Sequence, residues 1–382
     1  MKLNKKINVF ALDVDSETLK QFEECYSQKF VVAATLMPDA HSGYVAPIGA
    51  VLQTKDFIVP SWVGFDIGCG LIAVKIQGKN IFEKVKKNSE KIYNEVKKRV
   101  PMGLGLLNNK DELSEETKIK FKELVKKLES SKHNKNLVNF IKQTGERNLG
   151  SLGSGNHFIE LGFFKKELWL IIHSGSRNIG HKTAETYMKK SADSEKEYEK
   201  TFPIKADSEL GKEYLNVLEF CLDFALQNRL EISKKVIKII EEIIKEKINS
   251  KLWVNKNHNH AVLENKFYIH RKGATPAKKG ERGIIPANMR DGTFLVKGLG
   301  NKNFLYSSSH GAGRLKSRSQ ARKTISIAEF QDSMKGIVGT ITEKTIDESP
   351  MAYKNINLVM EAQKDSVKII KQIKPIINWK GV

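Results

Sequence analysis

The chain has 382 residues, and its hydrophobic fraction of 40% is enough to build a sizeable buried core. Lys and Arg number 65 against 44 Asp and Glu, a net charge of +21 that favours polyanionic partners, with nucleic acid first among them. No apolar run approaches the roughly 20 residues that cross a bilayer. Asp13 and Asp15 interrupt the first apolar segment too early for a signal peptide. The three cysteines are scattered along the sequence, which does not suggest a disulfide framework. The composition argues against membrane proteins and disulfide scaffolds and predicts a globular cytoplasmic protein.

Short strands separated by turns are expected in residues 7–75. Residues 30–37 are largely apolar, which predicts a buried strand, and another strand is expected at 71–75. Between them, Asp66 and Cys69 stand three residues apart among glycines. A carboxylate and a thiol in one tight loop suit a metal such as zinc or manganese, although a buried cysteine beside a turn-forming aspartate gives the same pattern.

Residues 81–147 carry apolar side chains at helical spacing and Lys/Glu pairs four residues apart, so scaffold helices are expected there. A Gly/Ser-rich loop then ends in His157 at the start of a strand, and a second strand at 168–172 runs directly into His173. Each histidine alone fits a hydrogen-bonded residue at a sheet edge. Because the pattern occurs twice, it favours a site that both histidines share.

Long packed helices are predicted for residues 208–250, where apolar stripes alternate with Lys and Glu. Beyond them, His258 and His260 form an H-x-H pair that a strand would place on one face, a chelating geometry that also arises by chance. No repeat or linker divides the sequence, so a single domain over 1–382 is expected, with a mainly helical segment at about 178–250.

Basic residues gather between Lys266 and Lys323, where 14 Lys or Arg stand against 2 acids, a net charge of +12. Within this stretch, the loop S-S-S-H-G-A-G-R at 307–314 places His310 between small residues. A phosphate group there would reach both the imidazole and exposed main-chain N–H groups. A solvated surface and an ordinary loop histidine would give the same sequence.

Seven residues amount together to a metal site plus a nucleophile: Asp66, Cys69, His157, His173, His258, His270 and His310. From near residue 37 onward, the chain contains the blocks P-D-A-H-S-G-Y…P-I-G, G-F-D-I-G-C-G, G-S-L-G-S-G-N-H-F-I-E, I-H-S-G-S-R, H-N-H-A, H-R-K-G-A-T, S-H-G-A-G-R and a final K-G. In this order the blocks resemble the RtcB family of RNA ligases, in a divergent bacterial-type branch.

The resemblance implies an α+β fold, a single RtcB-type domain in which mixed β-sheets surround a central di-metal cleft beside long packed helices. It implies a cytoplasmic RNA ligase that depends on GTP and two Mn²⁺ ions and acts in RNA repair or tRNA splicing. Such a ligase joins 2′,3′-cyclic phosphate or 3′-phosphate ends to 5′-hydroxyl ends through a guanylyl-histidine intermediate. The partners implied are RNA with these ends, GTP and an archease-type activator.

The same resemblance makes His310 the guanylylated residue and Asp39 a residue that assists the chemistry at the RNA end. The implied metal ligands are Cys69 as a bridge between two manganese ions, with Asp66 and His157 on one ion and His173 and His258 on the other. The residues implied around phosphate are Asn156, Arg177, Arg314 and Arg318, those around guanosine are Phe158, Glu160, Tyr353 and Lys380, and Asn288 and Thr293 are further hydrogen-bond donors near the nucleotide.

The sequence departs from the family pattern in one loop. Where the family usually shows P-G-S-M-G, this chain has P-A-N-M-R, and Arg290 and Asp291 are expected to add charge beside the nucleotide pocket. Two other functions fit part of the sequence: that of a metal-dependent RNA-end phosphatase or cyclic phosphodiesterase, and that of a non-catalytic RNA-binding protein. The complete S-H-G-A-G-R block with Lys380 argues against the first, and the metal-ligand set argues against the second.

Overall fold

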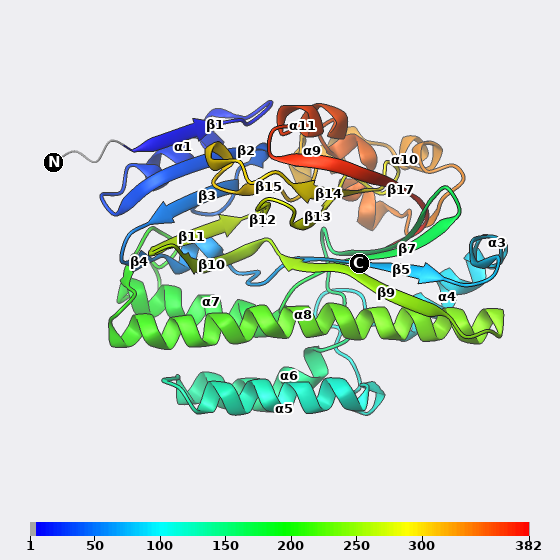
Figure 1. The fold of residues 1–382 in the computed structure, drawn as a ribbon, viewed down its shortest axis with the longest axis horizontal. Helices are drawn as coiled ribbons and strands as arrows, with labels where there is room; N and C mark the ends of the chain where they lie inside the picture. Colours follow the sequence, from blue (N-terminus) through cyan, green and yellow to red (C-terminus); the bar gives the residue numbers. More distant parts are fainter. Residues whose placement is uncertain (1–4, 382) are drawn as a thin grey trace.

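The computed structural model describes residues 5–381 and contains two large β-sheets with helices packed against them (Figure 1). Parallel and antiparallel strand pairs occur together, and this mixture of helices and mixed sheets confirms the α+β class. That residues 1–382 form one domain stays a prediction, and residues 1–4 and 382 lie outside the described part of the chain.

The smaller of the two sheets has the strand order β1-β2-β3-β11-β10. Strand β2 (Val31–His41) is the buried strand expected at 30–37, and it continues through Pro38 because its pairing with β3 is irregular between Leu36 and His41. The extension brings Asp39 and His41 to the end of the strand. The other strands are β1 (Lys6–Val9), β3 (Ile48–Thr54), β10 (Asn259–Glu264) and β11 (Phe267–Lys272).

The larger sheet has the order β13-β14-β17-β6-β7-β5-β9, with β16 parallel to β17. Strands β5, β6 and β7 are buried along most of their length, in agreement with their largely apolar sequences. The strands are β5 (Gly70–Gln77), β6 (Phe158–Phe164), β7 (Glu167–Ser174), β9 (Asn249–Asn257), β13 (Arg282–Pro286), β14 (Thr293–Gly298), β16 (Val338–Gly339) and β17 (Val367–Lys380). Two short pairs join β12 (Ala274–Pro276) to β15 (Ser307–Ser309) and β4 (Phe57–Ile58) to β8 (Ile204–Lys205).

Helix α8 (Glu209–Ile244) is one continuous helix of 36 residues, where several helices were expected over 208–250. Neither Gly nor Pro interrupts it after Gly211, so nothing ends it early. It contacts β5, β7 and β9 and also α5, and it lies between the sheets and the α5 and α6 helices (Figure 1). None of the helices in residues 5–381 is both long and apolar enough to cross a membrane.

The remaining helices are α1 (Ser16–Tyr26), α2 (Pro60–Val63), α3 (Ile81–Lys87), α4 (Ser89–Arg99), α5 (Glu115–Glu129), α6 (Lys135–Asn148), α7 (Arg177–Ala192), α9 (Arg318–Thr324), α10 (Ile327–Ser333) and α11 (Ile356–Ala362). The 3₁₀ segments are η1 (Lys110–Glu112), η2 (Lys302–Phe304), η3 (Glu343–Glu348) and η4 (Pro350–Ala352). The segment 178–250 thus contains most of α7 and all of α8, with the short strand β8 between them.

Candidate metal and nucleotide site

Four neighbouring strands of the larger sheet, β6, β7, β5 and β9, present polar residues at one edge. Their antiparallel pairing aligns Phe158 with His173, and it aligns Gly70 with both Ser174 and Asn257. The side chains at or next to these strand ends are those of His157, His173, Cys69 and His258. Residues that are far apart in sequence therefore meet because antiparallel neighbours alternate their starts and ends along one edge.

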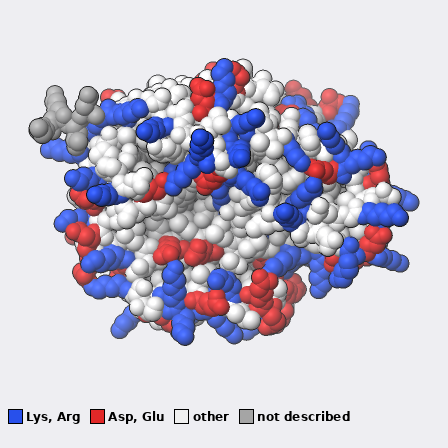
Figure 2. Space-filling model, viewed as in Figure 1, with Lys and Arg blue, Asp and Glu red and all other residues white. Residues whose placement is uncertain are grey.

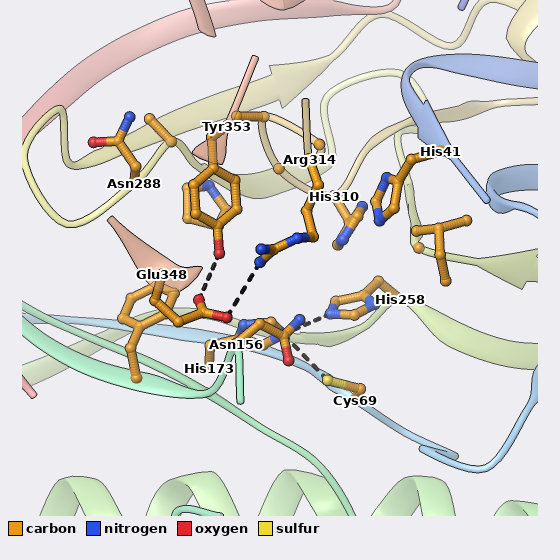
Figure 3. Close-up of a pocket in the computed structure, with 18 of the residues that line it drawn as sticks. His41, Cys69, Asn156, His173, His258, Asn288, His310, Arg314, Glu348 and Tyr353 are labelled. Atoms are coloured by element: carbon orange, nitrogen blue, oxygen red, sulfur yellow. Dashed lines mark hydrogen bonds and ion pairs between the residues drawn. The ribbon is translucent and has the colours of Figure 1, made fainter. Parts of the chain in front are cut away.

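Cys69 lies between two groups of potential metal ligands. Its Sγ is 3.3 Å from Nε2 of His157 and 3.1 Å from Nε2 of His173. Nε2 of His173 is 2.9 Å from Nε2 of His258, and Nε2 of His157 is 3.0 Å from Oδ2 of Asp66. The result is two triads, Cys69-His173-His258 and Asp66-Cys69-His157, that share the sulfur, with the ligand atoms of each within 4.8 Å of one another. Figure 3 shows the first of them.

The protonation states in this cluster suit a cation. Burial lowers the pKa of His173 and His258 well below the ordinary value, so both imidazoles are neutral, the form that binds metals. Nδ1 of His258 lies 3.2 Å from Oδ1 of Asn259, which places the proton on Nδ1 and leaves Nε2 with a free lone pair.

The cysteine adds the strongest constraint on what the cluster can hold. Burial, and then the neighbouring Asp66 carboxylate, raises the pKa of the Cys69 thiol well above its ordinary value. A thiolate at this position therefore needs a positive charge beside it. Sulfur, imidazole nitrogen and carboxylate oxygen together form a donor set for divalent ions of intermediate softness, so the residues present fit one ion at each triad.

Helix α8 holds the strand ends in place through one of its arginines, Arg229. Arg229, fully buried, donates to the main-chain oxygens of Gly68 at 3.0 Å and Ser174 at 2.8 Å. It also donates to Oδ1 of Asn255 at 2.7 Å and of Asn257 at 2.6 Å. One guanidinium therefore ties together the chain segments that carry Cys69, His173 and His258, which restricts how far the ligands can move apart.

His310 follows strand β15 and faces the metal cluster, with its ring centroid 4.8 Å from that of His258. Oδ2 of the fully buried Asp39 accepts hydrogen bonds from the main-chain N–H groups of His310 and Gly311, both at 3.1 Å, and lies 2.7 Å from Nδ1 of His310. Burial would raise the pKa of Asp39, but the facing His310 ring and its hydrogen bonds bring the pKa below the ordinary value. An ionised Asp39 thus orients the His310 loop.

A cavity of about 490 Å³ opens beside His310. The sequence-predicted residues that line it are Asp66, Cys69, Asn156, Phe158, Glu160, His173, His258, Asn288, His310, Arg314, Arg318, Tyr353 and Lys380. Four others lie just behind the lining: Asp39 beneath His310, His157 in the metal cluster, Thr293 against Glu160, and Arg177, whose guanidinium occupies the space beside Gly153.

Sequence reasoning missed Glu348, which lies among the cationic side chains of the cavity (Figure 3). Its side chain is 3% exposed and contacts Nζ of Lys380 at 2.8 Å, Nη1 of Arg318 at 2.8 Å, Nη1 of Arg314 at 3.3 Å and the hydroxyl of Tyr353 at 2.5 Å. Burial would raise the pKa of Glu348, but Lys380 and the two arginines lower it to about 2. The carboxylate is therefore ionised and holds these four groups around one point.

The pKa of Glu160 is shifted in the opposite direction from that of Glu348. Burial raises its pKa to about 8, although hydrogen bonds from Thr293 at 3.1 Å and Asn378 at 3.3 Å favour the charged form. The side chain is thus largely protonated at neutral pH, so it can donate one hydrogen bond as well as accept others. Asn378, which also lines the cavity, was not singled out from the sequence.

Two histidines singled out from the sequence, His270 of the group of seven and His260 of the H-x-H pair, lie outside the cluster. Nε2 of His270 accepts a hydrogen bond from the main-chain N–H of Val59 at 2.9 Å, so this residue holds β11 and the start of α2 together. His258 falls between β9 and β10, so it does not share a strand face with His260 as the H-x-H spacing predicts. Nε2 of His260 instead lies 3.3 Å from the buried guanidinium of Arg271.

The expected charges in the 286–293 loop neutralise one another. Arg290 and Asp291 form an ion pair at 2.9 Å, and Asn288 donates to the same aspartate at 2.8 Å. Neither charged residue lines the cavity, whereas Asn288 and Met289 do. The loop therefore changes the shape and hydrogen bonding of the cavity wall more than its charge.

Acids from outside the 266–323 segment pair with part of its positive charge. Glu264 contacts Arg271 and Lys278, at 3.0 and 2.9 Å, and Asp347 lies between Arg318 and Arg322, at 2.5 and 3.2 Å. Figure 2 shows Lys and Arg scattered over one face among uncharged residues, interspersed with Asp and Glu. The excess of basic residues is spread over this face and is not confined to a single patch.

Comparisons with known proteins agree with this arrangement. Residues 21–381 match the family described as "tRNA-splicing ligase RtcB". The chain is 31% identical to "RNA-splicing ligase RtcB" of Escherichia coli (strain K12), over 91% of this chain and 89% of the relative. It is 29% identical to "tRNA-splicing ligase RtcB" of Nanoarchaeum equitans, over 100% and 96%, and 29% identical to that of Methanococcus maripaludis, over 93% and 88%. The resemblance found in the sequence is confirmed, and the chain belongs to the RtcB family.

Proposed function

We propose that this protein is an RNA ligase that joins 3′-phosphate or 2′,3′-cyclic phosphate ends of RNA to 5′-hydroxyl ends, with GTP as co-substrate and two manganese ions. The observation that carries the proposal is the position of His310, which lies in one cavity with Cys69, the residue shared by two triads that could each hold a metal ion. The names of the relatives support RNA as the substrate. We further propose a cytoplasmic role in RNA repair or tRNA splicing, with an archease-type activator as partner.

The geometry around His310 suits nucleophilic attack. Because Nδ1 faces the Asp39 carboxylate, Nε2 is the ring nitrogen left to attack the α-phosphate of GTP, forming a P–N bond and releasing pyrophosphate. The guanylyl group then passes to an RNA 3′-phosphate, and the 5′-hydroxyl of the second strand displaces GMP. Manganese ions held at the two triads would neutralise phosphate charge during this chemistry.

The rest of the cavity is suited to hold the nucleotide. Arg314 and Arg318 carry guanidinium groups that bind phosphate oxygens bidentately. On the guanosine side, the ring of Tyr353 can stack on a base, and Glu160 can hydrogen-bond its polar edge. Asp39 orients the nucleophile and does not need to contact the substrate for that role.

Covalent labelling tests the proposal. Purified protein is incubated with Mn²⁺ and GTP labelled at the α-phosphate, and we expect a protein-bound label that survives alkali and is lost in acid, as a phosphoramidate requires. His310→Ala should carry no label, whereas His133→Ala, which changes a histidine outside the cavity, should label normally. Absence of label with every divalent metal tried would contradict the ligase, and phosphate release from RNA ends without any adduct would favour the phosphatase alternative.

The metal assignment has its own test. Cys69→Ala removes the sulfur that both triads share, so we expect loss of Mn²⁺ binding in calorimetric titration together with loss of the adduct. Cys25→Ala is the matched control, because Cys25 is also buried but packs among apolar side chains of the hydrophobic core. Full Mn²⁺ affinity in the Cys69 variant would refute the shared-ligand role.

A further inference from the structure

An exposed aromatic ring stands on the rim of the cavity. Tyr44 is 75% exposed although it lines the cavity together with His41 and Ser42. It follows His41 by three residues, and Figure 3 shows His41 and Tyr353 on opposite sides of His310. The loop that begins at His41 thus lies on the side of His310 away from Tyr353 and the proposed guanosine site.

A second aromatic side chain supports the ring. Tyr44 meets Phe65 edge to face, with centroids 5.8 Å apart and an interplanar angle of 86°. Phe65 in turn stacks on His181 of α7, at 4.9 Å and 21°. Such a series of aromatic rings positions the outer ring and leaves most of its surface open to a further planar group.

The loop that carries Tyr44 is held in place by hydrogen bonds between Gln21 of α1 and Gly43. The side-chain amide of Gln21 donates to the main-chain oxygen of Gly43 and accepts from its N–H, both at 3.0 Å. A Cβ on Gly43 would lie 2.3 Å from the main-chain oxygen of Ala46, so the turn requires glycine. An exposed ring on a fixed turn loses little conformational freedom when it binds a partner.

We propose that Tyr44 is a stacking site for the unpaired terminal base of an RNA strand whose end enters the cavity. The inference rests on the proposed function, since the reacting end of such a strand must reach His310. Bases stack on exposed aromatic rings regardless of sequence, with about 1–3 kcal/mol per base, and a chain with a net charge of +21 attracts the attached phosphates. The site is a single ring continuous with the cavity, which fits one base better than an apolar protein surface.

Binding of two kinds of RNA tests the site. Short single-stranded RNAs, one ending in a 3′-phosphate and one in a 5′-hydroxyl, are compared with versions that lack the terminal base, by fluorescence anisotropy with Mn²⁺ at fixed salt and without GTP. For at least one of the two ends, we expect the unaltered protein to bind the complete RNA roughly 5-fold to 150-fold more tightly than the abasic one. Tyr44→Leu should lose this preference, while Tyr44→Phe and Tyr44→Trp should keep it.

The leucine variant separates stacking from simple apolar contact, and the ratio of the two affinities corrects for any general loss of binding. Absence of a base preference in the unaltered protein, or an undiminished preference in Tyr44→Leu, would overturn the inference. Labelling of His310 remains a separate test. A protein that forms the adduct but ignores the terminal base refutes only the stacking site, and one that prefers the base but forms no adduct refutes only the ligase proposal.

Discussion

Replacing Glu348 by Gln removes the negative charge on which Lys380, Arg314 and Arg318 converge. The depression of its pKa from 4.5 to about 2 corresponds to about 3 kcal/mol of stability at pH 7. Because the Arg318 side chain is 46% exposed, solvent screens part of its share, and we expect a loss of about 2–3 kcal/mol. The folded-state pKa is the lower one, so this contribution is complete above pH 4.5 and is lost as pH falls toward 2.

The assay is urea unfolding of the metal-free protein, followed by tryptophan fluorescence, at pH 7 and at the lowest pH where both proteins remain folded. The difference between the unaltered protein and Glu348→Gln should shrink at the lower pH, since protonation then removes the same charge from the unaltered protein. Glu343→Gln is the matched control, because Glu343 begins the same 3₁₀ segment and is exposed. Equal stabilities at pH 7, or a difference that does not change with pH, would refute the reasoning.

Three further substitutions test other parts of the site. Arg229→Met removes four hydrogen bonds made by a fully buried side chain. The substitution should cost about 3–5 kcal/mol and weaken Mn²⁺ binding roughly 10-fold to 100-fold in calorimetric titration; unchanged Mn²⁺ affinity would contradict the role of Arg229. Asp39→Asn should slow labelling of His310 on the order of 10²-fold while circular dichroism stays unchanged, and an equal initial rate would count against orientation by the carboxylate. Glu160→Gln should be more stable than the unaltered protein by roughly 3–5 kcal/mol at pH 9 and nearly equal to it at pH 4. The reason is that the raised pKa makes ionisation of the folded glutamate costly, so the unaltered protein loses stability as pH rises from 4.5 to 8. A stability difference that does not depend on pH would disprove this.

The sequence was most informative where local chemistry decides the structure. Cys69 and His173 were recognisable because each stands at one end of an apolar strand, next to glycine- or serine-rich loop residues, and strand pairing then brings them together. The apolar stripe of 208–250 predicted helix correctly, but the stripe alone does not show whether one helix or two form it. The absence of Gly and Pro between residues 212 and 244 was the available signal for a single helix.

Glu348 shows what sequence patterns could not supply. Asp347 and Glu348 precede Ser349 and Pro350, which is typical of an exposed turn, and two adjacent acids are rarely buried. Their burial depends on cationic side chains from three places: α9, the loop that precedes α9, and the end of β17. None of these is close in sequence to η3. The position of Tyr44 beside the cavity likewise depends on Phe65, which lies 21 residues away in sequence, as well as on the adjacent turn at Gly43.

Strand β17 has a consequence for how the protein acquires its fold. Its first half pairs with β14 and its second half with β6, so it joins β13 and β14 to the strands that carry the metal cluster. Yet β6 ends on the order of 200 residues before β17 begins, which gives the pairing a high contact order and predicts slow folding. During synthesis on the ribosome, the main-chain N–H and C=O groups along this edge of β6 therefore stay unpaired until β17 has been made. Until then, the edge must be protected from pairing with other chains, which would lead to aggregation.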